Sequence, residues 1–126
     1  MYDEKQFRLT GEVAVITGAG AGIGRAMAET FAAAGAAVMV SDLDDAAAKQ
    51  VAGCIEKVGG RGAAMACDVT DEHALAALVD GTADRYGKLT VVVSNAGGGG
   101  PKPFDMPMAN FRRAFELNVF SLMRLA

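Results

Sequence analysis

A glycine-rich turn carries the clearest chemical signal in the 126 residues, where positions 17–24 read TGAGAGIG. Glycines let the backbone turn sharply and approach a pyrophosphate closely. A helix that begins there directs free N–H groups and a partial positive charge at the anion. Gly24 would also let that helix pack tightly on the preceding strand. The alternative is a tight turn without a ligand, but its position between a predicted strand and a predicted helix favours a phosphate site.

A carboxylate, Asp42, ends the second predicted strand, eighteen positions after Gly24. In a dinucleotide-binding unit such a carboxylate accepts hydrogen bonds from the ribose hydroxyls of NAD and repels the 2′-phosphate of NADP. The alternative role is the N-cap of the next helix, although Asp44 could cap that helix itself. Arg25, one position beyond the turn, could instead meet a phosphate. The predicted cofactor is NAD.

An amide side chain, Asn118, lies on an otherwise apolar stripe of the last predicted helix. Phe111, Phe115, Asn118 and Leu122 follow a spacing of four, three and four residues. A buried amide without partners costs about 1–3 kcal/mol, so we expect Asn118 to be hydrogen-bonded to a specific partner. A helix bend or a packing role is the alternative to a catalytic one.

The elements that must position these residues alternate between strands and helices. Strand, helix and strand follow one another three times, and the connections are too long for hairpins, which predicts parallel strands with right-handed crossovers. The sequence therefore predicts one α/β domain over residues 1–126, a doubly wound sheet with strand order 3-2-1-4. The predicted strands are 12–17, 36–42, 62–67 and 89–94; the helices are 23–34, 44–58, 71–86 and 108–126, with a glycine- and proline-rich loop at 95–107.

Helical periodicity predicts which residues face inward, and a continuous apolar run at 89–94 predicts a strand covered on both faces. The predicted stripes are Ile23, Met27 and Phe31; Ala47, Val51, Ile55 and Val58; and Leu75, Leu78, Val79, Thr82 and Tyr86.

Composition narrows the classes of function. The net charge of −3 argues against a nucleic-acid surface, and no apolar stretch approaches the roughly 20 residues of a membrane span. The polar N-terminus shows no secretory signal, so we expect a cytoplasmic protein. Cys54 and Cys67 fit buried thiols in a reducing compartment. His73 has no metal-ligand neighbours, and no metal site is predicted.

Four motifs together resemble the short-chain dehydrogenase/reductase family, a group of Rossmann-type oxidoreductases. They are TGxxxGIG at 17–24, Asp68-Val69 after the third strand, Asn95-Ala96-Gly97 after the fourth, and Asn118. The resemblance implies that Gly18, Gly22 and Gly24 form the pyrophosphate turn, that Asp42 binds ribose, that Asp68 and Val69 flank the adenine, and that the backbone at 95–97 lines the cleft. It also implies cofactor contacts from Thr17, Ile23 and Leu43.

Two details of that resemblance leave alternatives open. Asp68 could equally cap the helix that begins near Asp71, and the same residue could both cap that helix and contact the adenine. Ser94-Asn95 stands where the family usually has two asparagines, and we expect a local adjustment there.

Within the family, the segment at 97–121 resembles bacterial hydroxysteroid dehydrogenases. The implied activity is NAD-dependent hydride transfer with a hydroxysteroid or another bulky secondary alcohol or ketone, with Asn118 holding a water in an Asn-Ser-Tyr-Lys proton relay. No Tyr-x-x-x-Lys pair is present, because Tyr2 is followed by Gln6 and Tyr86 by Thr90. We therefore expect the chain to be the N-terminal part of the fold, truncated before the later strands and inactive alone.

Other functions and an assembly state also follow as expectations. The alternatives are a non-catalytic dinucleotide-binding or assembly module, and an NADPH-dependent keto-acyl or quinone reductase of the same family. The fourth strand should be an exposed apolar sheet edge, which favours association. The resemblance also implies a homo-oligomer, since full-length relatives often form dimers or tetramers through the last helix seen here and the next one.

Overall fold

The computed structural model describes residues 3–98 and 107–126, so most of the loop predicted at 95–107 lies outside the described residues. A short 3-10 helix, η1 (Glu4–Phe7), precedes the alternating elements. These are β1 (Val13–Ile16), α1 (Gly22–Ala33), β2 (Ala37–Asp42), α2 (Asp45–Lys57), β3 (Arg61–Ala66), α3 (Glu72–Tyr86), β4 (Val91–Val93), α4 (Met108–Phe115), η2 (Glu116–Phe120) and α5 (Ser121–Leu125).

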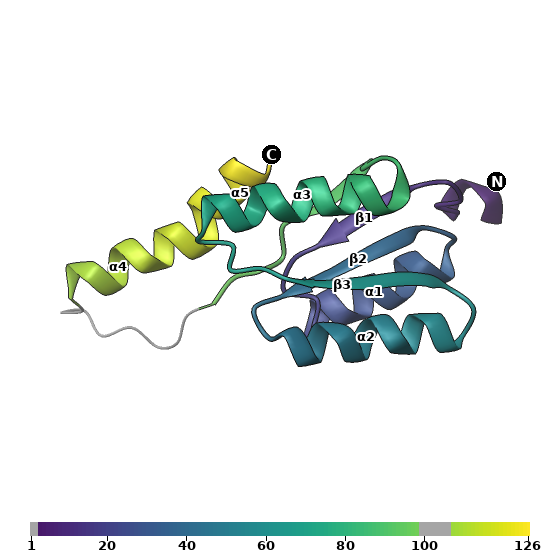
Figure 1. Cartoon of the computed structure of the whole chain (residues 1–126), viewed down its shortest axis with the longest axis horizontal. Coiled ribbons are helices and arrows are strands. Elements are labelled where there is room, and N and C mark those ends of the chain that lie inside the picture. The colour runs from purple at the N-terminus through teal and green to yellow at the C-terminus, as the bar shows by residue number, and fades with distance from the viewer. Residues whose placement is uncertain (1–2, 99–106) are drawn as a thin grey trace.

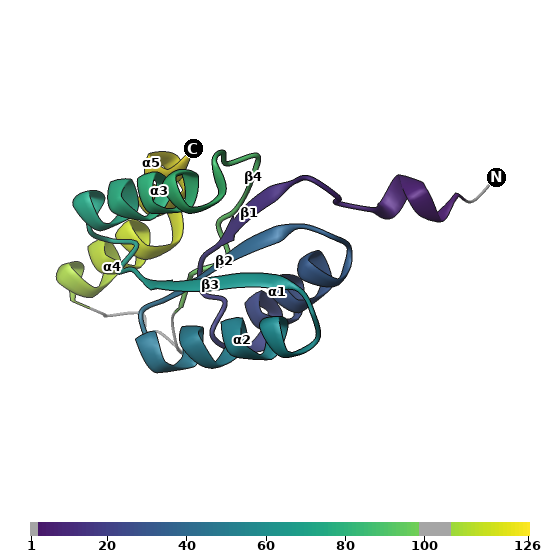
Figure 2. The same ribbon diagram turned by 45° about the vertical axis from the view of Figure 1, so that its right-hand side comes forward.

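The described strands form one parallel sheet in the order β3-β2-β1-β4, which confirms the predicted topology. Helices α1 and α2 cover one face, and α3 and α5 lie on the other, whereas α4 projects past the end of the sheet (Figures 1 and 2). Consecutive residues of β1 and β2 serve opposite faces: Ile16 and Val40 pack towards α1 and α2, whereas Val15 and Met39 pack towards α3. The result is a three-layer α/β fold.

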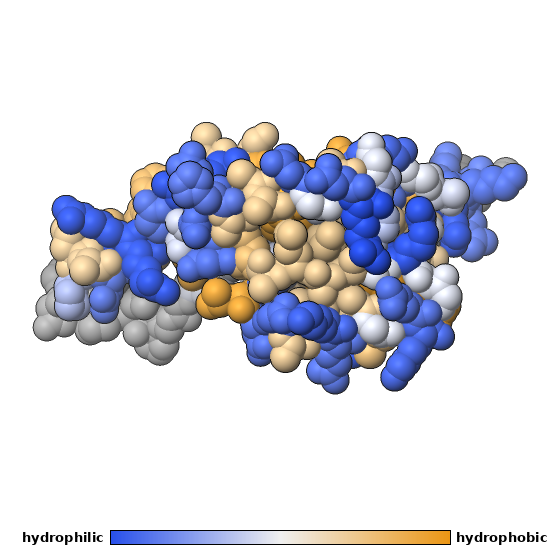
Figure 3. Space-filling view, in the orientation of Figure 1, coloured by the Kyte–Doolittle hydropathy of each residue, from blue (hydrophilic) through white to orange (hydrophobic). Residues whose placement is uncertain are grey.

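The surface reflects the edge position of β3. On the face seen in Figure 1, apolar residues gather in the middle, where β3 lies, between hydrophilic rows on α2 and α3 (Figure 3). No helix among residues 3–98 and 107–126 is both long and apolar enough to cross a membrane.

The inward face of α1 differs from the prediction. The helix buries Gly24, Ala28 and Ala32, whereas Ile23 is 76% exposed and Met27 and Phe31 are only partly buried. Small residues let the helix axis approach the sheet closely, and this close approach turns the larger side chains to the flanks.

The other two helices agree better with the predicted stripes. In α2, Val51 and Ile55 are buried, but Val58 follows the last helical residue and is 85% exposed. Ala47 is half-buried, next to the fully buried Ala48. The predicted inward face of α3 is confirmed, with Leu75, Leu78 and Thr82 buried and Val79 and Tyr86 packed against the same cluster.

Strand β4 is shorter than the predicted run at 89–94, and it forms the sheet edge that we expected. The hydroxyl of Thr90 accepts a hydrogen bond from the N–H of Val13 at 2.9 Å, so a side chain replaces the backbone partner just before the strand. Val92 is 42% exposed, so the expectation that both faces are covered is wrong for the described chain.

The last helix is interrupted by a π-helical segment, η2. The N–H of Ser121 donates to the carbonyl of Glu116, five residues earlier, where an α-helix would bond four residues back. The inward face consists of the partly buried Leu117 and the buried Ser121 and Leu125. The predicted stripe of Phe111, Phe115 and Leu122 is exposed, so the expected burial of this face is wrong.

Candidate functional site

A cleft of about 300 Å³ lies at the carboxyl ends of the parallel strands, the edge where open α/β sheets bind ligands. Eight of the predicted cofactor-binding residues line it, together with Cys67 and Leu117. The eight are Gly18, Asp42, Leu43, Asp68, Val69, Asn95, Ala96 and Gly97. Of the remaining predicted residues, Thr17 is 1% exposed, and Gly22, Ile23 and Gly24 begin α1.

The turn between β1 and α1 has the geometry expected of a phosphate-binding turn. Gly18 and Gly22 have φ angles of +64° and +59°, a region that L side chains rarely adopt. The N-cap residue of α1, Ala21, makes no side-chain capping bond, and the first turn holds no acidic residue. Because the first N–H groups of a helix lack intrahelical partners, this end of α1 is suited to an anion.

Gly24 is required for the contact between α1 and the turn. A Cβ on Gly24 would overlap the carbonyl oxygen of Gly18 and lie 2.5 Å from Nδ2 of Asn95. Close packing at Gly24 is therefore present as predicted, but its partner is the turn at Gly18 and not the preceding strand.

Thr17 ties this turn to the loop after β4. Its buried Oγ1 accepts hydrogen bonds from the N–H groups of Asn95 at 3.1 Å and Ala96 at 3.0 Å, and donates to the carbonyl of Val93 at 3.4 Å. Nδ2 of Asn95 in turn donates to the carbonyl of Gly18 at 3.1 Å. Two loops far apart in sequence thus form one wall of the cleft.

Asp42 presents its carboxylate at the cleft and is held by main-chain donors. Oδ2 accepts from the N–H of Gly20 at 2.9 Å, and Oδ1 accepts from the N–H of Asp44 at 3.0 Å. Asp44 caps α2 by accepting from the N–H of Ala47 at 3.1 Å. The alternative role of Asp42 as an N-cap is therefore wrong.

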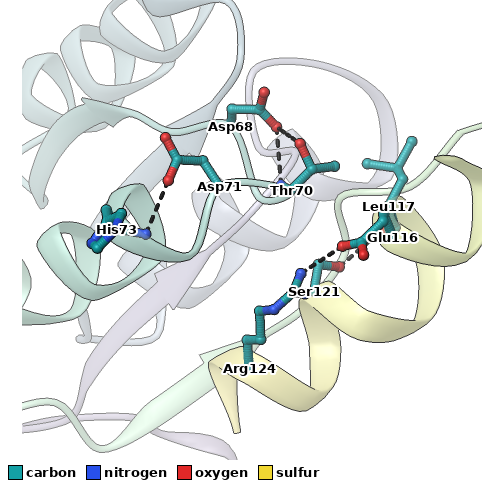
Figure 4. Close-up of polar contacts among 8 residues, drawn as sticks. All are labelled: Asp68, Thr70, Asp71, His73, Glu116, Leu117, Ser121 and Arg124. Carbon is teal, nitrogen blue, oxygen red and sulfur yellow. Dashed lines mark hydrogen bonds and ion pairs between the residues drawn. The ribbon is translucent and has the colours of Figure 1, made fainter.

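Asp68 lines the same cleft from the segment between β3 and α3, and its carboxylate is held by Thr70 (Figure 4). Its Oδ1 accepts from both the N–H and the hydroxyl of Thr70, at 2.9 and 2.6 Å. The two bonds from Thr70 lower the pKa of this carboxyl. Asp71, not Asp68, caps α3, since it accepts from the N–H groups of His73 and Ala74. Oδ2 of Asp68 makes no bond to the described residues and remains available to a ligand.

Asn118 is exposed, yet it is hydrogen-bonded as expected. Oδ1 accepts from the N–H of Gly98 at 3.1 Å, and Nδ2 donates to the carbonyls of Gly98 at 3.0 Å and Ala114 at 2.9 Å. Gly97 leaves the room for this contact, because a Cβ there would lie 2.7 Å from Oδ1. The bond to Ala114 inserts a side chain into the helical ladder, one of the known causes of a helix irregularity, so the helix-bend role is supported.

The same segment is held by two further contacts (Figure 4). Arg124 pairs with Glu116 at 2.6 Å, and the hydroxyl of Ser121 donates to the carbonyl of Leu117 at 2.6 Å. These contacts fix Leu117, which lines the cleft beside Ala96 and Gly97. Its place next to Asn118 in the sequence was the available signal for this missed residue.

Cys67 is the second lining residue that sequence reasoning did not assign to the site. Burial, and secondarily the nearby carboxylates of Asp68 and Asp71, raise the pKa of this thiol to about 11. The position directly before Asp68 was the available signal. Since the thiolate is the reactive form, Cys67 lines the cleft as an unreactive thiol.

Arg25 does not face the cleft as a free cation. Its Nε pairs with Glu29 at 2.8 Å, one turn further along α1, and its Nη2 lies 4.0 Å from Sγ of Cys54. Among the residues that the structure describes, no group of three or more histidine, cysteine or acidic side chains could hold a metal ion.

Comparison with known proteins gives consistent results. The family model for "short chain dehydrogenase" matches residues 12–126. The 7α-hydroxysteroid dehydrogenase of Escherichia coli K12 is 55% identical over 126 residues, which cover all of this chain and 49% of that protein. Secoisolariciresinol dehydrogenase of Forsythia intermedia is 39% identical over 116 residues, or 89% of this chain and 41% of that protein.

Comparison with a solved structure shows the same similarity in three dimensions. A 7α-hydroxysteroid dehydrogenase in complex with NADH and 7-oxoglycochenodeoxycholic acid superposes with a TM-score of 0.97 at 55% identity, covering 99% of this chain and 49% of that one. The expected similarity to bacterial hydroxysteroid dehydrogenases is confirmed. The chain spans about half the length of the relatives it matches.

Proposed function

Because the chain belongs to the short-chain dehydrogenase family, we propose that the protein transfers hydride between NAD(H) and a secondary alcohol or ketone, with a hydroxysteroid as substrate. Similarity to an enzyme solved with NADH and a 7-oxo bile acid supports both the cofactor and the substrate class. The proposal assigns to these 126 residues the cofactor site, since they contain no Tyr-x-x-x-Lys pair for proton transfer.

The observation that carries the proposal is the pairing of an uncapped helix start with a fixed carboxylate. The turn at Gly18 and Gly22 and the first N–H groups of α1 suit a pyrophosphate, and Asp42 at the end of β2 suits the adenosine ribose. A 2′-phosphate would lie against the Asp42 carboxylate and be repelled, so we propose selectivity for NAD over NADP.

In the proposal, the remaining lining residues contact different parts of the cofactor. In our proposal Asp68 and Val69 flank the adenine, and the main chain at 95–97 lies along the cleft towards the reacting end. When bound, the nicotinamide supplies the site that accepts or releases hydride. We propose that Asn118 acts as a positioning residue, because its amide exchanges two hydrogen bonds with the main chain of Gly98 and donates a third to the carbonyl of Ala114.

The test is cofactor binding and turnover by the protein expressed from its complete reading frame. We expect tighter binding of NAD⁺ than of NADP⁺, and formation of NADH with a 7α-hydroxy bile acid but not with its 7β epimer. The variant Asp42→Ala should lose the preference for NAD⁺. A clear preference of the wild type for NADP⁺ would contradict the cofactor assignment, whereas activity on both epimers would contradict only the substrate assignment.

An exposed aromatic face supports a homo-oligomer, which we propose as well. Phe111, Phe115 and Phe120 are 46%, 41% and 45% exposed on α4 and η2, with ring centroids 4.9 and 6.3 Å apart. Apolar patches of this kind mark interaction surfaces. Light scattering should give the mass of a dimer or tetramer for the wild type and a smaller mass for Phe115→Glu; a monomeric wild type would refute the proposal.

A further inference from the structure

Gly20, the middle glycine of the turn at 17–24, lies directly against the carboxylate of Asp42. Its N–H donates to Oδ2 of Asp42 at 2.9 Å. A Cβ on Gly20 would lie 2.8 Å from that oxygen and 2.9 Å from the Cβ of Ala47. The donating amide and the missing side chain together determine where the carboxylate lies.

Glycine is needed at this position for space and not for backbone conformation. Gly18 and Gly22 have positive φ angles, whereas Gly20 does not. No positive φ angle therefore requires glycine at this position. The added methyl group would be accommodated only by turning the Asp42 carboxylate away or by shifting α2 at Ala47.

We propose that Gly20 is a positioning residue for cofactor selection, which holds Asp42 in the orientation that distinguishes the ribose 2′-hydroxyl of NAD from the 2′-phosphate of NADP. The inference rests on the function proposed above for Asp42. The other oxygen, Oδ1, is held by the N–H of Asp44 at 3.0 Å. Each carboxylate oxygen keeps acceptor capacity for a ribose hydroxyl, so the ribose site is set before the cofactor binds.

This arrangement makes the phosphate turn and the ribose carboxylate a single unit. Gly20 lies between Gly18 and Gly22, the two residues whose backbone shapes the turn. A change at Gly20 therefore reaches cofactor selection through Asp42, with no need to alter the conformation of the turn.

The test measures dissociation constants for NAD⁺ and NADP⁺ by titration calorimetry on the protein expressed from its complete reading frame. We expect Gly20→Ala to weaken NAD⁺ binding about ten-fold, as for the loss of a hydrogen bond to a charged group, and to leave NADP⁺ binding no weaker. Added to Asp42→Ala, it should leave the ratio of the two constants unchanged, since it acts on selection through that carboxylate. The matched control is Gly53→Ala in α2, where a Cβ meets nothing within 4 Å.

The outcomes separate this inference from the proposed function. If Asp42→Ala removes the preference for NAD⁺ and Gly20→Ala leaves it intact, the role of Gly20 is wrong and the proposed function stands. If Asp42→Ala leaves the preference unchanged, both are wrong. Amide hydrogen exchange gives a test without any Gly20 variant. Protection of the Gly20 N–H that is lost in Asp42→Ala supports the inference, and an unprotected N–H in the wild type refutes it.

Discussion

Two buried threonines allow a sharp test of how the cleft is held together. Thr17 and Thr82 are 1% and 0% exposed, and both hydroxyls are hydrogen-bonded. The hydroxyl of Thr17 is the acceptor for two main-chain N–H groups of another loop. The hydroxyl of Thr82 donates to the carbonyl of Leu78, which an α-helix already pairs with the N–H of residue 82. The substitution threonine to valine, which removes only the hydroxyl, should therefore have different consequences at the two sites.

The magnitude follows from what each substitution leaves without a partner. Thr17→Val leaves the N–H groups of Asn95 and Ala96 without a hydrogen-bond partner in a half-buried site. Each unpaired group should lower the free energy of unfolding by about 1–2 kcal/mol, which gives about 2–4 kcal/mol in total. Thr82→Val leaves no main-chain group unpaired and should change the free energy of unfolding by less than about 1 kcal/mol. Thr17→Ser keeps the hydroxyl and loses one buried methyl group, about 1 kcal/mol.

The assay is urea unfolding of the three variants and the wild type, with NAD⁺ binding as a second readout. For a slope of about 2 kcal/mol per molar, Thr17→Val should lower the midpoint by about 1–2 M. It should also weaken NAD⁺ binding, because the loop at 95–97 would lose its hydrogen bonds to the Thr17 hydroxyl. Equal shifts for Thr17→Val and Thr82→Val, or a Thr17→Ser variant as unstable as Thr17→Val, would refute this reasoning.

Three further predictions concern packing, an unpaired hydroxyl and a buried thiol. Gly24→Ala should lower the free energy of unfolding by about 2–4 kcal/mol in urea titrations, because the methyl group would overlap the carbonyl of Gly18. Ser41→Ala should raise the melting temperature in calorimetry, since the buried hydroxyl of Ser41 has no partner among the described residues; a lowered value would mean that the hydroxyl is bonded after all. Cys67 should resist iodoacetamide at pH 8 while the half-buried Cys54 reacts, as mass spectrometry would show. Because folding raises the pKa of Cys67 to about 11, its protonated form favours the fold, and this contribution is fully present below about pH 8.5 and is lost as the pH rises towards 11.

Sequence periodicity was sufficient for the topology, and with local motifs it also located two parts of the site, the turn at Gly18 and the carboxylate of Asp42. The strand–turn–helix order around residues 17–24 placed the turn at the carboxyl edge of β1, and the length of the second strand placed Asp42 beside it. Both inferences depend on local patterns and on the handedness of parallel connections, which hold across folds of this class. Asp68 and residues 95–97 came from the family resemblance, and they line the same cleft.

The inward faces of two helices could not be read from periodicity, because distant contacts decide them. Ile23 lies on the predicted stripe of α1, but the contact of Gly24 with the Gly18 turn rotates the buried face by one residue. In the last helix, the π segment contains Asn118, whose partner Gly98 lies twenty residues earlier. Hydrophobic spacing carries no information about either contact.

The polar side chains around the cleft share one property, which explains how a loop-built site is kept rigid. Thr17, Asp42, Asn95 and Asn118 each bond the main chain of a different loop or helix. The segment at 95–98 is held by Thr17 from the β1 side and by Asn118 from the last helix, so it has little freedom to lose when a cofactor binds. Because ordering costs oppose binding, a site whose loops are already joined in this way retains more of its interaction energy as affinity. We therefore expect the residues that hold the loops to contribute to cofactor binding even where, like the buried Thr17, they are closed off from solvent and from the cleft.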